Sequence, residues 1–282
     1  MDRKLFQDII NDTERAFYAS KDADFFNIKI AGPIDGESAF KESSNIEVRD
    51  SHFELRYPFW HNTDTKIMNC DFTDTCRAPF WYCNGLSFDI ATCNGVKAIR
   101  ECKNIKIIDS TFNSEEFCWR SDNIEVENTK ITGFYAFFQC KNIKIKNMTF
   151  KGKYSFQYVE NMVIDDSDLD TKDAFWHTKN VVVRNSKIIG EYLGWYSENL
   201  TLVNCHIKGT QPLCYCKNLN IIDCTFEDCD LSFEYSEVNG SIKGSIVSIK
   251  NPLKGQLSIE KEPEMIVDEN DRSHGQFSLK VK

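Results

Sequence analysis

The sequence of 282 residues lacks any run of 18 or more apolar residues, the length that a membrane-spanning helix needs. Its first residues, 1–8, contain no apolar segment of the kind that begins a signal peptide. These two absences favour a cytoplasmic protein with no membrane partner. Because thiols stay reduced in the cytoplasm, we expect the 12 cysteines to form no disulfide bonds.

An excess of positive charge is also missing. The chain has 34 lysines and arginines against 43 aspartates and glutamates, which gives a formal net charge of -9. Proteins that bind nucleic acid need a basic surface to neutralise the phosphates. The composition therefore argues against a nucleic-acid partner.

Sequence motifs of the common catalytic and metal sites are absent as well. The chain contains no P-loop, no GxSxG and no HExxH. Among the cysteines only Cys214 and Cys216 approach the spacing of a zinc site. We therefore expect no metal and no cofactor, and we interpret the cysteines as small buried residues of the core.

What the chain does contain is a regular repeat of about 19 residues. Each repeat begins with Asn, or once with Asp and once with Gly, and continues with alternating apolar residues. The intervals between repeat starts are equal in length with one exception, the interval from Asp64 to Gly85, which is longer by two. The repeats begin at Asn45, Asp64, Gly85, Asn104, Asn123, Asn142, Asn161, Asn180, Asn199 and Asn218.

This repeat predicts an all-β fold, a single-stranded parallel β-helix of about ten coils. Alternation with β-branched residues is typical of strands, and about 19 residues are too few for a helix, a strand and their turns. Asn and Asp favour the corners because they tolerate left-handed backbone, and stacked Asn amides bond from coil to coil. Glycine suits a corner for the same backbone reason. Four glycines share one corner column: Gly133, Gly152, Gly190 and Gly209.

The ends depart from the repeat, which divides the chain into three parts. Residues 1–44 are expected to form irregular coils that cap the N-terminal end. Residues 45–236 form the repeats, and residues 237–282 form further strands and an acidic tail as the second cap. A solenoid needs such caps because its terminal coils expose strand edges.

One pair of neighbouring columns is rich in large aromatic residues. All five tryptophans lie four residues before a repeat start: Trp60, Trp81, Trp119, Trp176 and Trp195. The next column holds His61, Tyr82, Glu101, Arg120, Gln139, Tyr158, His177, Tyr196, Tyr215 and Glu234. If the small residues one position further on, such as Cys83, point inward, simple alternation turns the tryptophans inward too; the opposite register exposes them. In either register one face carries aromatics among polar groups, a surface suited to sugar rings or a protein. The alternative is that the tryptophans only fill the core.

The candidate site residues follow from this face. The candidates for ligand binding are Tyr82, Tyr158, Trp176, His177, Tyr192, Trp195, Tyr196 and Tyr215. The ionisable residues considered for acid–base catalysis are Glu101, Arg120, Asp173, His177 and Glu191. Glu101 and Arg120 lie one coil apart, as an ion pair or as half of an active site. Asp173 and His177 lie about 13 Å apart along an extended strand, so they meet only across a bend.

Several segments resemble an uncharacterised bacterial family, catalogued as a domain of unknown function and similar to right-handed β-helix, pectin-lyase-like proteins. The segments are Lys41–Asn45, Lys172–Trp176, Gly190–Trp195, Phe233–Ser236 and Lys250–Leu253. The resemblance spans residues 7–267 and implies a right-handed parallel β-helix in a bacterial cytoplasmic protein. It implies no activity and no catalytic residues. Residues 69–73 and 223–227 also resemble one face of pentapeptide-repeat proteins, which is the alternative fold.

Two classes of function remain open, with a third beside them. A noncatalytic scaffold would recognise a carbohydrate or a protein through the aromatic face. A polysaccharide lyase or glycoside hydrolase would use the ionisable residues named above. A purely structural protein would self-associate through its coil ends or the aromatic face. The direction in which the tryptophans point is the observation that weighs most between these hypotheses.

Overall fold

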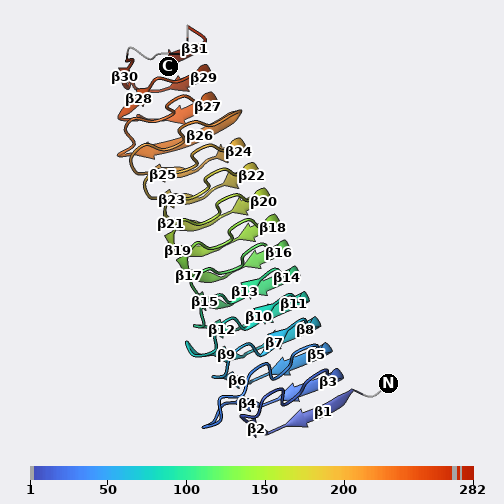
Figure 1. Cartoon of the computed structure of the whole chain (residues 1–282). Coiled ribbons are helices and arrows are strands. Elements are labelled where there is room, and N and C mark those ends of the chain that lie inside the picture. The colour runs from blue at the N-terminus through green and yellow to red at the C-terminus, as the bar shows by residue number, and fades with distance from the viewer. Residues whose placement is uncertain (1–2, 269–271, 274) are drawn as a thin grey trace. The chain divides into compact units, whose positions relative to one another are not determined.

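The computed structural model describes residues 3–268, 272–273 and 275–282, and every regular element in them is a β-strand. The chain divides into two compact units, residues 1–143 and 144–282. Figure 1 shows that, within each unit, corresponding strands of successive coils lie one above the other. The part of the chain described here contains no helix that is long and apolar enough to cross a membrane.

In residues 1–143 the strands form three rows, and neighbours within each row pair in parallel. The first row consists of β1 (Lys4–Gln7), β3 (Lys21–Phe26), β5 (Ser44–Arg49), β8 (Thr63–Met68), β11 (Asn84–Asp89), β14 (Lys103–Ile108) and β16 (Asp122–Glu127). The second consists of β2 (Ile10–Asn11), β4 (Lys29–Ile30), β6 (His52–Phe53), β9 (Asp71–Phe72), β12 (Thr92–Cys93), β15 (Thr111–Asn113) and β17 (Lys130–Phe134). The third, a short row, consists of β7 (Phe59–Trp60), β10 (Phe80–Trp81) and β13 (Ile99–Arg100).

Residues 144–282 continue the same plan, and β18 (Lys141–Lys146) contains the boundary between the units. The first row consists of β20 (Glu160–Asp165), β22 (Lys179–Arg184), β24 (Glu198–Val203), β26 (Leu219–Glu227), β27 (Glu237–Lys243), β29 (Lys254–Ile259) and β31 (Phe277–Val281). The second consists of β19 (Thr149–Lys153), β21 (Asp168–Lys172), β23 (Lys187–Ile189) and β25 (His206–Lys208), and it ends on β26. A separate pair is formed by β28 (Ser248–Lys250) and β30 (Glu264–Ile266).

The register between coils confirms the predicted parallel β-helix. Phe88 pairs with Ile107 and Ile107 with Val126, each at the equivalent position of the next repeat along the chain. The period of this pairing is not a multiple of five, so it does not fit the five-residue pattern of the alternative fold. Successive coils wind in the right-handed sense, which crossovers between parallel strands of one sheet almost always adopt.

The number of coils differs from the prediction. The described residues form about 14 coils rather than ten. The difference arises because strands before residue 45 and after residue 236, such as β3 and β29, join the same rows although their sequences have lost the repeat. The role of these end segments as caps stays a prediction.

Stacked phenylalanines fill the interior of the coils. Phe40 stacks on Phe59 with ring centroids 5.0 Å apart, and Phe156 stacks on Phe175 at the same distance. These four side chains are almost completely buried. Identical positions in successive coils thus place a ring against a ring, which adds to the free energy gained by burial alone.

The repeat asparagines form the predicted ladder on the outside of the coils. In residues 144–282, Asn218 donates its amide to Asn199 at 2.8 Å, and Asn199 donates to Asn180 at 2.9 Å. All three have φ between 50° and 56°, the left-handed conformation that Asn tolerates better than most residues. The asparagines therefore both turn the chain and bind the coils to one another.

All 12 cysteines are free and buried. Several donate a hydrogen bond to a backbone carbonyl of the preceding coil, as Cys102 does to Phe80 at 3.4 Å and Cys216 to Gly194 at 3.1 Å. Burial raises the pKa of the Cys93 and Cys216 thiols to about 12. Thiols of this kind are poor nucleophiles, which fits a structural role.

A close approach between coils generates a prediction about Gly190. Gly190 has φ +148°, and a Cβ placed on it lies 2.2 Å from the backbone oxygen of Thr171 in the preceding coil. We expect Gly190→Ala to lower the free energy of unfolding by about 2 kcal/mol or more, because the backbone must move to relieve the contact. Gly244→Ala is the control, because Gly244 also has positive φ (+77°) but no atom within 4 Å of its added Cβ. Urea denaturation measures the free energy of unfolding of both variants. Equal losses in the two would show that the contact with Thr171 is not the cause.

Candidate functional site

The tryptophan column points outward and is half-buried, which settles the direction that alternation left open. In the coil of Trp81, both Phe80 and Cys83 are buried, whereas Trp81 is half-buried and Tyr82 exposed. Tyr82 has φ +57°, a left-handed corner that interrupts the alternation between Trp81 and Cys83. The column of small residues that includes Cys83 therefore faces inward, although the tryptophan two positions earlier faces outward.

Each tryptophan has a structural role that accounts for its column. The indole Nε1 always donates a hydrogen bond to a backbone carbonyl of the next coil along the chain. These bonds run from Trp60 to Ala78 (2.9 Å), Trp81 to Lys97 (3.1 Å), Trp119 to Tyr135 (2.6 Å), Trp176 to Tyr192 (2.6 Å) and Trp195 to Gln211 (2.8 Å). The predicted ligand residues Trp176 and Trp195 also stack on one another at 5.3 Å. The indole N–H groups of Trp176 and Trp195, and one face of each ring, therefore make contacts within the protein and are not open to a ligand.

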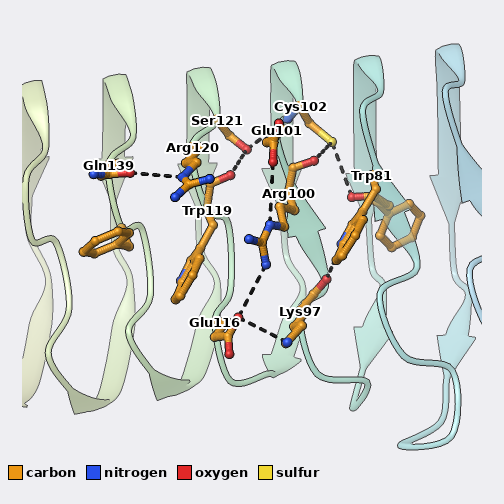
Figure 2. A network of polar contacts seen from close by, with 12 residues as sticks. Trp81, Lys97, Arg100, Glu101, Cys102, Glu116, Trp119, Arg120, Ser121 and Gln139 are labelled. Atoms are coloured by element: carbon orange, nitrogen blue, oxygen red, sulfur yellow. Dashed lines mark hydrogen bonds and ion pairs between the residues drawn. The ribbon is translucent and has the colours of Figure 1, made fainter.

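Arg100 replaces tryptophan in this column and lies between Trp81 and Trp119 (Figure 2). Its guanidinium lies 5.1 Å from the ring of Trp81 and 5.0 Å from the ring of Trp119. Glu116 approaches Arg100 and Lys97 at 3.6 Å each. The cation therefore joins two indoles by cation–π contacts and continues the stack.

Glu101 and Arg120 do not form the pair that their spacing suggested. Glu101 approaches Arg100 at 3.8 Å, and Arg120 donates from Nε to the side-chain oxygen of Gln139 at 3.0 Å (Figure 2). Each therefore has a partner other than the one expected. These contacts are typical of a surface network and not of one half of an acid–base site.

The most regular aromatic surface lies in residues 144–282. Tyr158, His177, Tyr196, Tyr215 and Tyr235 occupy equivalent corners of five coils, and we call this row the aromatic ladder. The first four rings stack with centroids 4.8–4.9 Å apart and within 11° of parallel, and Tyr235 lies 5.9 Å beyond Tyr215. In residues 1–143 a shorter stack joins Tyr82 to His61 at 4.9 Å.

The last member of the ladder differs from the sequence prediction. The sequence placed Glu234 in this column and Phe233 in the tryptophan column, whereas Phe233 is fully buried and Tyr235 occupies the corner. The interval between Tyr215 and Tyr235 exceeds the regular repeat by one, so an extra residue shifts the columns. Glu234 instead binds Lys250 at 2.8 Å and accepts a hydrogen bond from the Tyr215 hydroxyl at 3.4 Å.

The ladder exposes ring edges rather than ring faces. His177 has a tyrosine ring on each side, and Tyr196 lies between His177 and Tyr215. Tyr158 and Tyr196 are 45% and 46% exposed. Within the described residues, neither the Tyr196 hydroxyl nor the His177 imidazole has a hydrogen-bond partner. A ligand therefore meets a row of polar edges, and the interior rings have no free face for stacking.

Beside the ladder, Lys172, Asp173, Glu191 and Tyr192 form a second group of candidates. Lys172 binds Glu191 at 2.6 Å and lies 5.1 Å from the centre of the Tyr192 ring. Asp173 is only 7% exposed, and its carboxyl makes no hydrogen bond within the described residues. Burial raises the pKa of Asp173, Lys172 opposes this, and Glu191 adds to it. Among the carboxylates and the arginine predicted for catalysis, Asp173 is thus the one whose charged group has no hydrogen bond or ion pair within the described residues.

The chain bends between Asp173 and His177, at left-handed residues such as Phe175, without producing a direct interaction between the two side chains. In the described structure no hydrogen bond or ion pair joins them, and His177 is held within the aromatic ladder. The described residues also contain no group of three or more His, Cys, Asp or Glu that could hold a metal ion.

The sequence prediction missed a groove in residues 1–143. It has a volume of about 610 Å³ and lies between loops that leave the second row of strands, with Glu54, Arg56, Asp74 and Arg77 among its lining residues. The longer interval from Asp64 to Gly85 was the signal of this feature, because the extra residues fall in one of those loops.

The burial of Asp173 predicts how stability depends on pH. Its pKa is raised in the folded protein, so ionisation favours the unfolded state, and stability is lost as pH rises from the ordinary pKa through the raised one. We expect Asp173→Asn to unfold at a higher urea concentration than the wild type at pH 7. The gain should vanish below the ordinary aspartate pKa of about 3.9. Asp170→Asn, at an exposed carboxylate 3.9 Å from Lys151, is the control and should show no gain. A less stable Asp173→Asn at pH 7 would mean that the carboxylate has a stabilising partner.

Comparison with solved structures finds matches at low identity and low TM-score. The surface adhesin PfbA of Streptococcus pneumoniae is 10% identical, with a TM-score of 0.37, and the match covers 99% of this chain and 82% of that one. The mannuronan C-5 epimerase AlgE4 A-module of Azotobacter vinelandii is 10% identical, with a TM-score of 0.32 and coverage of 98% and 88%. The catalytic domain of a GH87 alpha-1,3-glucanase is 8% identical, with a TM-score of 0.43 and coverage of 99% and 64%.

Sequence comparison is more decisive. The curated proteins give no match. A family described as "Protein of unknown function (DUF3737)" matches residues 4–280, nearly the whole chain. The resemblance inferred from the sequence is therefore confirmed, and the chain belongs to this family of unknown function.

Proposed function

We propose that this protein is a noncatalytic scaffold that binds an extended, uncharged carbohydrate along the aromatic ladder. The observation that carries the proposal is the exposed row of ring edges, in which stacking between coils accounts for the rings but not for the polar groups of His177 and Tyr196. The indole donors of the tryptophans are used between coils, whereas the polar groups of His177 and Tyr196 remain available to a ligand.

The repetition of the ladder favours a repetitive ligand. Its rings recur every 4.8–4.9 Å from Tyr158 to Tyr215, a distance comparable with the length of one pyranose unit in an extended chain. Phenol and imidazole groups both donate and accept hydrogen bonds, as sugar hydroxyls do. A polymer lying along the ladder would therefore meet an aromatic edge at each step, with free polar groups at His177 and Tyr196, whereas a protein epitope has no such repeat.

The charges beside the ladder favour a neutral ligand. A row of alternating charge runs beside the ladder: its first five members lie two positions after the five ladder residues, and the sixth, Lys254, begins β29. The row consists of Glu160, Lys179, Glu198, Lys217, Glu237 and Lys254. Opposite charges at neighbouring positions attract, so the row is balanced and presents no net field to a polyanion.

A second candidate function is a polysaccharide lyase or glycoside hydrolase, and the observation in its favour is Asp173. A buried carboxyl with a raised pKa and no hydrogen bond suits a general acid. The other predicted ionisable residues with a charge, Glu101, Arg120 and Glu191, are held by other side chains. Incubation with a panel of polysaccharides decides this candidate, because product formation that Asp173→Asn abolishes would replace the scaffold proposal with catalysis.

The scaffold proposal predicts the effect of removing the polar edges without removing the rings. Tyr196→Phe combined with His177→Phe keeps the stack but deletes the hydroxyl and the imidazole nitrogens. Because each hydrogen bond contributes about 0.5–1.5 kcal/mol, we expect the double variant to bind an oligosaccharide about tenfold more weakly. A glycan array identifies the ligand, and calorimetry measures its affinity.

The matched control is Tyr18→Phe, which removes an exposed tyrosine hydroxyl that binds Glu42 in residues 1–143. It should bind the glycan as the wild type does. If the wild-type protein binds no glycan on the array, or if the double variant binds as tightly as the wild type, the proposal is wrong. If the protein instead captures another protein, and this binding depends on Tyr196, the ladder recognises a protein partner and not a carbohydrate.

A further inference from the structure

Two lengthened loops in residues 1–143 lie on either side of a shorter one. The connection between β9 and β10 comprises residues 73–79, two more than the connection between β12 and β13, residues 94–98. The connection from β4 to Phe40, residues 31–39, is also longer than the connection from β6 to Phe59, residues 54–58. Insertions of this kind are often found on the binding face of a repeat protein.

These loops border the open groove of about 610 Å³. Gly32 and Pro33 line it from one long loop, and Asp74 and Arg77 from the other. Glu54, Leu55 and Arg56 come from the short loop between them. With Val96 of the following loop, the lining comes from four successive coils. Neighbouring coils are about 4.8 Å apart, so the groove extends over about three coil spacings, and its volume is in the range of small-molecule sites.

Most charges of the groove are already neutralised by other side chains. Arg56 binds Asp35 and also Glu37, the latter at 2.8 Å. Glu54 contacts His52 at 3.0 Å and Lys29 at 3.8 Å. Among the described residues, the carboxylate of Asp74 and the guanidinium of Arg77 have neither a hydrogen bond nor an ion pair. The groove therefore offers one anion and one cation, three residues apart on the same loop.

The other residues that line the groove indicate which class of ligand it can bind. No aromatic ring lines the groove among the described residues, so it lacks the platform on which a sugar ring stacks. It does contain the apolar side chains of Pro33, Leu55 and Val96. A free guanidinium prefers a carboxylate, which it can bind with two hydrogen bonds, and a free carboxylate prefers an ammonium group.

We infer that this groove binds a small zwitterion of the α-amino acid type. Arg77 holds the ligand carboxylate, Asp74 holds the ammonium group, and the apolar residues accept an aliphatic side chain. The site is separate from the aromatic ladder in the sequence and in its chemistry, so it does not depend on the proposed carbohydrate function.

Calorimetry on the full chain with L-leucine and glycine as probes tests the inference. We expect L-leucine to bind more tightly than glycine, because its side chain buries apolar surface. Acetate and methylammonium, which carry one charge each, should bind far more weakly than either. Arg77→Gln and Asp74→Asn should each weaken L-leucine binding by about 10- to 100-fold, since each removes a charged hydrogen bond.

Both substitutions are at exposed side chains, and the urea midpoint of each variant checks that it folds. The control is Arg184→Gln, which removes an exposed arginine paired with Asp165 in residues 144–282 and should bind L-leucine normally. The inference is overturned if no amino acid binds, or if binding survives either groove substitution. It is also overturned if glucose binds in place of the amino acids and Asp74→Asn abolishes that binding, because the groove would then recognise hydroxyl groups.

Discussion

The structure depends on one constraint, which is that the backbone N–H and C=O groups of each coil must pair with those of the coils beside it. Parallel, in-register pairing places every side chain next to its equivalent in the neighbouring repeat. Each position must therefore be occupied by a residue that tolerates its own neighbour. Phenylalanines stack, asparagine amides bond in a chain, and charges must alternate. The ladders of this protein are the solutions to that requirement.

Much of the fold could be predicted from the sequence, because in-register pairing requires similar residues at equivalent positions and so produces a visible repeat. The strands around Ile105 and Ile124, the Asn corners and the buried column of small residues that includes Cys83 all follow from periodicity. The repeat fades toward both ends, where the coils differ in length, as between Lys21 and Ser44 or between Glu237 and Lys254. For this reason strands such as β3 and β29 were assigned to caps and the number of coils was underestimated.

The candidate site was less accessible to sequence reasoning, for a physical reason that lies in the backbone. Left-handed residues such as Tyr82 reset the alternation, so no counting rule gives the direction of Trp81. One extra residue before Tyr235 shifts two columns, which placed Glu234 and Phe233 wrongly. Glu101 and Arg120 are adjacent in the repeat, but their side chains choose other partners. The ligand roles of Tyr82, Tyr158, Tyr192 and Tyr215 stay predictions.

The alternating row from Glu160 to Lys254 also limits how such a chain can change in length. Its chemical period is two coils, although its structural period is one. Deleting or duplicating a single coil would bring two like charges together and leave a fault in the row, whereas a change of two coils would restore the order. Addition or loss of coils in pairs therefore has the lowest electrostatic cost, because each coil in this row carries one of two alternating charges.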